Sequence, residues 1–301
     1  MPTLVVPERV SPVAGYADAP RLAPRRAFVP DRLGRRRFQA RAAGRVVSLE
    51  TACSSQWERE GGGRRGCVGD WSAASRRRLF RAVCSLPVDR YPAKLFVTLT
   101  YPGVFPTDGR VVKAHLSALG ERYRRRWGAR PKWVWKMEYQ ERGAAHFHLL
   151  VFLPPEWLFT DERLHALRDW FAGAWYEVVG SGDLRHLSAG TDVQVPYSDL
   201  SRYFAYALKG SQNVVPDGFV HPGRVWGVWG IRPEWRGVKL TEADWVEIRR
   251  RLRRWAKSAG ARVAKGGRLQ GEWVIARPGR AGAGLLEQLA RGLGRPVQRA
   301  P

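Results

Sequence analysis

The chain has 301 residues, 44% of them hydrophobic and 14 of them Trp, which is enough for a substantial core in one or two domains. Its formal net charge of +25 at pH 7 favours a polyanionic partner. We expect a cytoplasmic protein, because no apolar stretch is long enough to span a bilayer and the first residues lack the pattern of a signal peptide. The three cysteines stand at irregular spacing and indicate neither a disulfide framework nor a zinc knuckle.

The predicted elements begin with a basic, largely irregular arm over residues 1–70, where clusters of Pro, Gly and Arg dominate. A short helix is expected over 71–86. From residue 93 onward the hydrophobic pattern alternates between the period of a strand and that of a helix. It predicts strands over 94–101, 132–140, 146–153 and 191–195, and helices over 110–127, 161–178 and 199–209.

This order is typical of a split βαβ, or ferredoxin-like, arrangement, in which helices pack on an antiparallel sheet. The expected fold class is therefore α+β, with one domain over residues 71–215. Residues 216–301 are expected to form a basic C-terminal extension with one helix, over about 241–257. That helix carries five arginines within residues 249–254, which fit either phosphate contacts or a solvated face.

Two histidines, His146 and His148, stand in the predicted strand after residue 145. Successive side chains of a strand point to opposite faces, so both imidazoles share one face and Phe147 takes the other. The turn at Glu141–Gly143 makes a hairpin that brings Glu138 across to the pair. Two imidazoles and a carboxylate leave open positions on a divalent metal ion, as a catalytic metal needs. A His-x-His pair alone is usually explained by packing, so the rest of the chain has to show whether this pair binds a metal ion.

The predicted helix over residues 199–209 carries Tyr206 beside its apolar stripe, with Arg202 four residues before it and Lys209 three residues after it. A phenol between two cations suits phosphoryl transfer, because the cations stabilise the phenolate and hold a phosphodiester. An ordinary helix surface would explain the same residues. Tyr203 lies on the apolar stripe and is expected to be part of the core. The catalytic helix must itself face the sheet, so the position of the stripe does not decide between the two tyrosines.

Together these residues resemble the HUH endonucleases, in particular the rolling-circle replication initiators (Rep proteins) of small phages and plasmids. Three motifs stand in the family's order: Phe96 to Pro102 resembles the first, His146-Phe147-His148 is the His-hydrophobic-His motif, and Tyr206-Ala207-Leu208-Lys209 fits the Tyr-x-x-Lys motif. The resemblance covers about residues 72–230. It implies that the predicted domain is an HUH endonuclease domain, with Glu138 as a third metal ligand.

The resemblance further implies metal-dependent nicking and joining of single-stranded DNA at a replication origin. Mg²⁺ or Mn²⁺ would activate the scissile phosphate, and a tyrosine would attack it to leave a 5′-phosphotyrosine link and a free 3′-OH. Tyr206 is the preferred nucleophile with Lys209 assisting it, but some relatives use two tyrosines, so Tyr203 stays a candidate. A host helicase and a host polymerase are the expected partners, since the chain contains no Walker A motif.

Four further residues are expected to contact the nucleic acid: Thr98, Thr100, Arg142 and Arg202. Two other interpretations stay open. One is a relaxase or a single-strand transposase of the same fold. The other is a non-enzymatic single-stranded nucleic-acid-binding protein, because an antiparallel sheet with aromatic residues and surplus Arg suits base stacking. Only the enzymes leave DNA covalently attached to a tyrosine.

Overall fold

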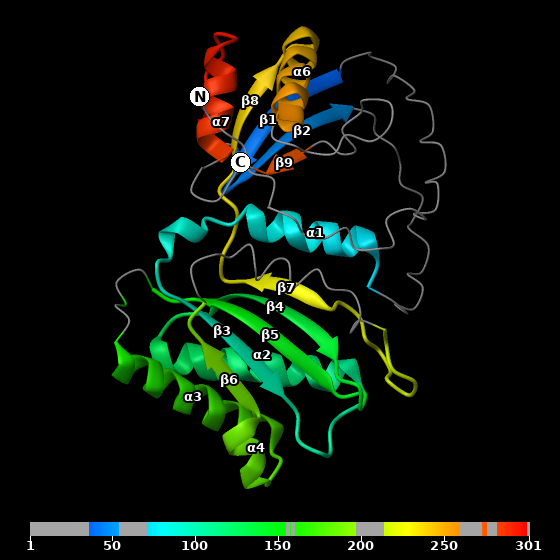
Figure 1. The fold of residues 1–301 in the computed structure, drawn as a ribbon, viewed down its shortest axis with the longest axis vertical. Coiled ribbons are helices and arrows are strands. Elements are labelled where there is room, and N and C mark those ends of the chain that lie inside the picture. The colour runs from blue at the N-terminus through cyan, green and yellow to red at the C-terminus, as the bar shows by residue number, and fades with distance from the viewer. Residues whose placement is uncertain are drawn as a thin grey trace. The chain divides into compact units, whose positions relative to one another are not determined.

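The structure is a computed structural model that describes residues 36–53, 71–154, 157, 160–196, 214–258, 273–275 and 282–299. The chain divides into two compact units, each containing a five-stranded sheet (Figure 1). The first unit comprises Met1–Gly63, Cys84–Leu86 and Pro233–Pro301, and the second comprises Arg64–Val83 and Pro87–Arg232. None of the helices in the described ranges is long and apolar enough to cross a membrane.

The sheet of the second unit has the strand order β6-β3-β5-β4-β7, and each neighbouring pair is antiparallel. Its strands are β3 (Lys94–Thr100), β4 (Lys132–Tyr139), β5 (Ala145–Phe152), β6 (Thr191–Gln194) and β7 (Trp226–Trp229). Helix α2 (Gly109–Trp127) follows β3, and α3 (Asp161–Val179) follows β5. This connectivity confirms the predicted α+β, ferredoxin-like split βαβ arrangement. Strand β7, which was not predicted, extends the sheet beyond β4.

Helices α2 and α3 lie along one face of this sheet (Figure 1). The side chain of Asp108 caps the N-terminus of α2, and Thr160 caps α3 in the same way. The apolar faces of the helices then meet the odd-numbered residues of the strands. The ring of Tyr123 lies 6.0 Å from that of Trp133, and the ring of Trp175 lies 6.4 Å from that of Phe147. The core of the unit is therefore on the odd-numbered face.

The opposite, even-numbered face meets the segment that leads into α1. The described part of this unit also contains shorter helical elements, namely α1 (Ala73–Cys84, of which Cys84 belongs to the first unit), the 3₁₀ helix η1 (Val88–Arg90) and α4 (Leu184–Ala189). Trp226 of β7 donates a hydrogen bond from Nε1 to Oγ of Ser75 in α1, over 3.0 Å. The ammonium of Lys136 lies 4.6 Å from the ring centre of Trp71, just before the helix. These contacts cover the β4–β7 side of that face.

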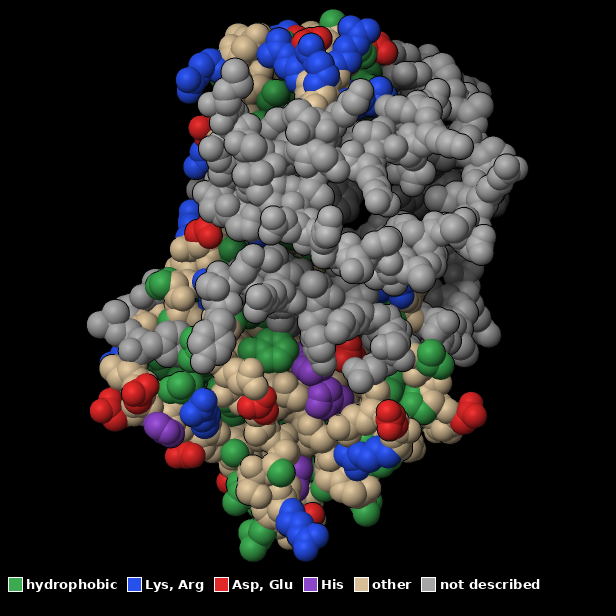
Figure 2. All heavy atoms as spheres, in the orientation of Figure 1, with side chains coloured by type: hydrophobic (Ala, Val, Ile, Leu, Met, Phe, Trp, Pro, Cys, Tyr) green, Lys and Arg blue, Asp and Glu red, His purple; other side chains and the backbone are tan. Residues whose placement is uncertain are grey.

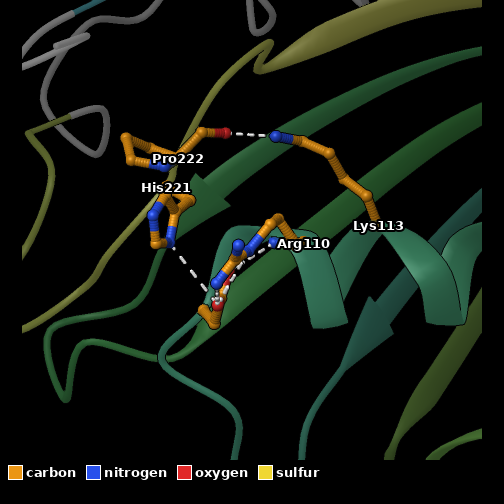
Figure 3. Close-up of polar contacts among 5 residues, drawn as sticks. Arg110, Lys113, His221 and Pro222 are labelled. Carbon is orange, nitrogen blue, oxygen red and sulfur yellow. Dashed lines mark hydrogen bonds and ion pairs between the residues drawn. The ribbon is translucent and has the colours of Figure 1, made fainter.

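Residues 220–222, which precede β7, form hydrogen bonds and an ion pair with residues at the start of α2 (Figure 3). Val220 exchanges backbone hydrogen bonds with this region, accepting from the N–H of Gly109 over 2.9 Å. The imidazole of His221 and the guanidinium of Arg110 both point at the carboxylate of Asp108, and Lys113 donates to the carbonyl of Pro222. A side chain at Gly109 would come within 2.3 Å of the carbonyl oxygen of His221, so only glycine allows this approach.

The first unit has a sheet in the order β10-β8-β1-β2-β9, again antiparallel throughout. Its elements are β1 (Arg36–Ala43), β2 (Val46–Cys53), β8 (Arg236–Leu240), α6 (Glu242–Ser258), β9 (Trp273–Ile275), α7 (Gly282–Arg291) and β10 (Gln298–Arg299). Gly44, with φ of +50°, allows the two-residue turn between β1 and β2. Figure 2 shows Lys and Arg side chains gathered over α6.

This arrangement differs from the expected irregular arm over residues 1–70 and the expected separate extension over 216–301. Residues 36–53 form a hairpin that pairs with β8 and β9 from the far end of the chain. Strand β1 is rich in Arg and Ala, residues that rarely indicate a strand, so its conformation depends on its pairing with β2 and with β8, which lies about 200 positions away. The boundary expected at residue 215 also differs, because β7 belongs to the second unit.

The core of the first unit joins the sheet to α6 and α7. Its buried members are Ala40, Ala42, Val47, Leu49 and Val238 from the strands, Ile248 and Leu252 from α6, and Leu286, Leu289 and Ala290 from α7. The two helices therefore cover one face of a sheet that contains both N-terminal and C-terminal strands.

The burial of Ile248 gives a test of this core. We expect Ile248→Ala to lower the free energy of unfolding of the first unit by about 3 kcal/mol, because it removes buried methylene groups and leaves a cavity. Chemical denaturation followed by circular dichroism measures the change. Arg250→Ala, at an exposed position of the same helix, should change the stability by less than about 0.5 kcal/mol. Equal effects of the two substitutions would contradict this packing.

Candidate active site

The candidate site lies on the even-numbered face of the second sheet, where β5 begins and β3 and β4 end. The register places Thr100, His146 and Glu138 opposite one another on β3, β5 and β4. The next row contains Thr98, His148 and Lys136. We call the face defined by these six residues the site face. It brings Glu138 across from the histidines, as the hairpin predicted.

The hydroxyls of the two threonines orient the two imidazoles. Oγ1 of Thr100 is hydrogen-bonded to Nδ1 of His146 over 3.0 Å, and Oγ1 of Thr98 to Nδ1 of His148 over 3.3 Å. In both rings Nε2 therefore points away from the threonines. Sequence reasoning assigned Thr98 and Thr100 to the nucleic acid and missed this role. The i, i+2 spacing shared by the threonines and the histidines was the signal, but its meaning depends on β3 pairing with β5.

The backbone of Thr100 is itself held from the other side of the sheet. Its carbonyl accepts hydrogen bonds from Nε1 of Trp175 and from Nε2 of His186, both over 2.9 Å. Its N–H donates to the carbonyl of Gly190 over 2.8 Å. His186 is buried, and its role in these hydrogen bonds is structural. These bonds fix the end of β3 and with it the hydroxyl that orients His146.

Glu138 lies deep in the site, with only 2% of its surface exposed. One carboxylate oxygen, Oε1, accepts from the ammonium of Lys136, and the other, Oε2, lies 3.2 Å from Nε2 of His148. Burial alone would raise the pKa of Glu138, but the hydrogen bond with His148 and the ammonium of Lys136 outweigh it and lower the pKa below its usual value. The carboxylate is therefore ionised at neutral pH.

His146 lies nearer the surface than Glu138, but it is still largely enclosed. Burial, together with the neighbouring His148, lowers its pKa from 6.5 to about 4. The ring is consequently neutral at physiological pH, which is the form that binds a metal ion. Lys136 was not predicted as a site residue, although a lysine two positions before a glutamate in an otherwise apolar strand is an available signal.

The remaining predicted site residues fall into two groups. Arg142, at the hairpin turn, donates to the carbonyls of Tyr101 and Pro102, each over 2.6 Å, so it ties the turn to the end of β3. Its contact with nucleic acid stays a prediction. The predicted helix and its four site residues lie outside the described residues: Arg202, Tyr203, Tyr206 and Lys209.

The donor set of the site face fits a divalent metal ion. A histidine that ligates a metal commonly uses one nitrogen and hydrogen-bonds through the other, and both Nδ1 atoms are already engaged by hydroxyls. A hydroxyl can donate or accept, so Thr98 accommodates either tautomer of His148. Among the described residues, no three His, Cys, Asp or Glu side chains already stand as a set of metal ligands. Glu138 would have to exchange a present contact for the ion.

The fold and the site define an α+β domain with two histidines, two threonines and a buried Lys–Glu pair on one sheet face. Residues 94–209 match the family model described as replication-associated protein ORF2/G2P. The matched stretch contains both the His-x-His pair and the Tyr-x-x-Lys motif. This similarity supports a place among replication initiators and a role in DNA replication. The comparison with curated proteins found no match.

The environment of His146 predicts its titration. We expect its imidazole to titrate near pH 4 in the folded, ion-free protein, measured by NMR of the ring protons. The unfolded chain takes up this proton near pH 6.5, so the stabilising contribution of the neutral ring is complete above pH 6.5 and is lost as the pH falls towards 4. His146→Asn should accordingly make stability less dependent on pH in this window. A titration near pH 6.5 would contradict the burial.

Proposed function

We propose that the second unit is an HUH-type endonuclease that nicks and rejoins single-stranded DNA and thereby initiates rolling-circle replication of a phage or plasmid. One observation carries the proposal: Glu138, His146 and His148 share one sheet face, with both imidazoles oriented by hydroxyls, inside a stretch similar to replication-associated proteins. The site face has the donors for a metal ion, and the net charge of +25 suits a DNA partner.

In this proposal Glu138, His146 and His148 hold Mg²⁺ or Mn²⁺. Imidazole ligands make Mn²⁺ more acceptable than it is at an all-oxygen site. The bound ion would polarise the scissile phosphate. Thr98 and Thr100 keep the two rings in place, and the neutral state of His146 leaves its nitrogen lone pair free for a ligand role over the physiological pH range.

The reaction is a transesterification in which Tyr206 is the proposed nucleophile. The phenol oxygen forms a bond to phosphorus while the bond from phosphorus to the 3′ oxygen breaks. The phenol loses its proton, and the departing oxygen gains one to become a free 3′-OH. The 5′ phosphate stays on the tyrosine as a diester, so rejoining needs no ATP. Lys209, one helical turn away in the predicted helix, would stabilise the negative charge.

The proposed metal ligands are tested by substitution. His146→Ala and His148→Ala should each reduce Mn²⁺-dependent cleavage of a single-stranded origin oligonucleotide by at least about a hundredfold, because each removes a ligand. Binding of the oligonucleotide should persist, with an affinity that falls as salt concentration rises. His165→Ala, at an exposed position of α3, is the matched control and should cleave normally. Full cleavage by a His146 and His148 double variant in a chelator would refute the metal site.

The nucleophile is tested by mapping a covalent adduct. Tyr206→Phe keeps the ring and removes the oxygen, so the protein should fold while the DNA–peptide adduct disappears from mass spectra. Tyr203→Phe should retain the adduct. Loss of the adduct in Tyr203→Phe alone would transfer the role to that residue. Binding without any adduct in the unsubstituted protein would favour the non-enzymatic interpretation, and adducts at both tyrosines would indicate that the two alternate during strand transfer.

A further inference from the structure

Lys136 is a fully enclosed cation on the site face, with 1% of its surface exposed. It sits on β4 directly opposite His148, two residues before Glu138. Its ammonium contacts Oε1 of Glu138, so the two side chains form a buried ion pair. Neither the resemblance to the HUH family nor the proposed reaction assigns this residue a role.

The ammonium of Lys136 is held in place by more than its partner. It lies 4.6 Å from the ring centre of Trp71, which is itself buried, and a cation over an aromatic face is attracted to it. The pleat of β4 points Lys136 and Glu138 to the same face, so their contact is set by the strand. The lysine is therefore a fixed charge and cannot extend into solvent as a surface lysine does.

A buried carboxylate requires a compensating charge, because removing a charge from water without a partner is costly. In the ion-free site Lys136 supplies that charge to Glu138. A divalent ion bound by the same carboxylate would be close to the ammonium, and two neighbouring positive charges repel each other strongly in a buried environment. Lys136, which stabilises Glu138 in the absence of metal, would then weaken the binding of the metal ion by Glu138.

We propose that Lys136 is the resident counter-ion of Glu138: it balances the charge of the buried carboxylate and holds it in position before the divalent ion arrives, and it lowers the affinity of the site for that ion. The first part concerns the ion pair alone, and the second part rests on the proposed metal site. Lys136 is a positioning residue, since it acts through Glu138.

The ion pair is tested on the full-length protein without metal. Lys136→Met keeps much of the volume and removes the charge, and we expect the melting temperature to fall by about 10 °C because Glu138 loses its partner. Glu138→Gln should also lower it, because the ammonium is then unpaired. The double variant should regain most of the loss, since it removes both charges. Additive losses in the double variant would overturn the first part.

The effect on metal is tested by Mn²⁺ binding, measured by electron paramagnetic resonance or calorimetry. Lys136→Met should bind Mn²⁺ at least about tenfold more tightly than the unsubstituted protein, because a repulsive charge is removed. Lys136→Gln, which keeps a hydrogen-bond donor for the carboxylate and so supports folding, should shift the affinity in the same direction. Lys132→Met, the same change four residues earlier on β4, is the matched control and should leave the affinity within about twofold.

The outcomes separate the two parts of the proposal from the proposed function. Unchanged or weaker Mn²⁺ binding in both Lys136 variants would overturn the affinity role and would mean that the lysine serves only to place the carboxylate. Absence of Mn²⁺ binding in the unsubstituted protein as well would refute the metal site and the affinity role with it. The melting temperatures of the single and double variants would still decide the ion pair.

Discussion

The antiparallel hydrogen-bond ladder that joins β5 to β3 on one side and to β4 on the other determines which side chains meet in the second unit. Because the side-chain period of a strand is two, a slip of one residue in either pairing would move the histidines away from Glu138 or from the threonines. The apolar odd-numbered face, packed against α2 and α3, opposes such a slip, since it would turn Phe147 or Trp133 towards the polar site face and charged groups into the apolar core. The hydrophobic core thus holds the polar site in register.

The site itself shows how a buried polar cluster is tolerated. Nδ1 of each of the two imidazoles has a hydroxyl partner, and each oxygen of Glu138 has a nitrogen neighbour. The backbone of Thr100 is held by Trp175 and His186, which lie outside the cluster. A cluster satisfied in this way is rigid, and rigidity matters for a metal-assisted reaction because misplaced ligands lower its rate. Lys136 belongs to this cluster even though it is a poor candidate for a metal ligand.

The sheet of the first unit is built from segments that lie far apart in the sequence. Its strands come from residues 36–53 and from the C-terminal part of the chain, so its sheet exists only when distant segments pair. Strand β1 has little intrinsic preference for its conformation, and its Ala40 and Ala42 are buried because α6 and α7 lie over them. In the second unit the β4–β5 hairpin joins strands that are neighbours in the sequence, whereas β3 pairs with β5 and β6 from farther along the chain.

The sequence by itself determined the parts that depend on local periodicity. The helices α2 and α3, the hairpin of β4 and β5, the α+β class and the shared face of His146 and His148 all follow from patterns of two or 3.6 residues and from caps and turns. Tertiary structure alone decided that Thr98 and Thr100 orient the histidines, that Lys136 pairs with Glu138, and that the two ends of the chain build one sheet. Those contacts join strands or segments whose pairing is not encoded by neighbouring residues, because register and burial emerge only when the core is packed.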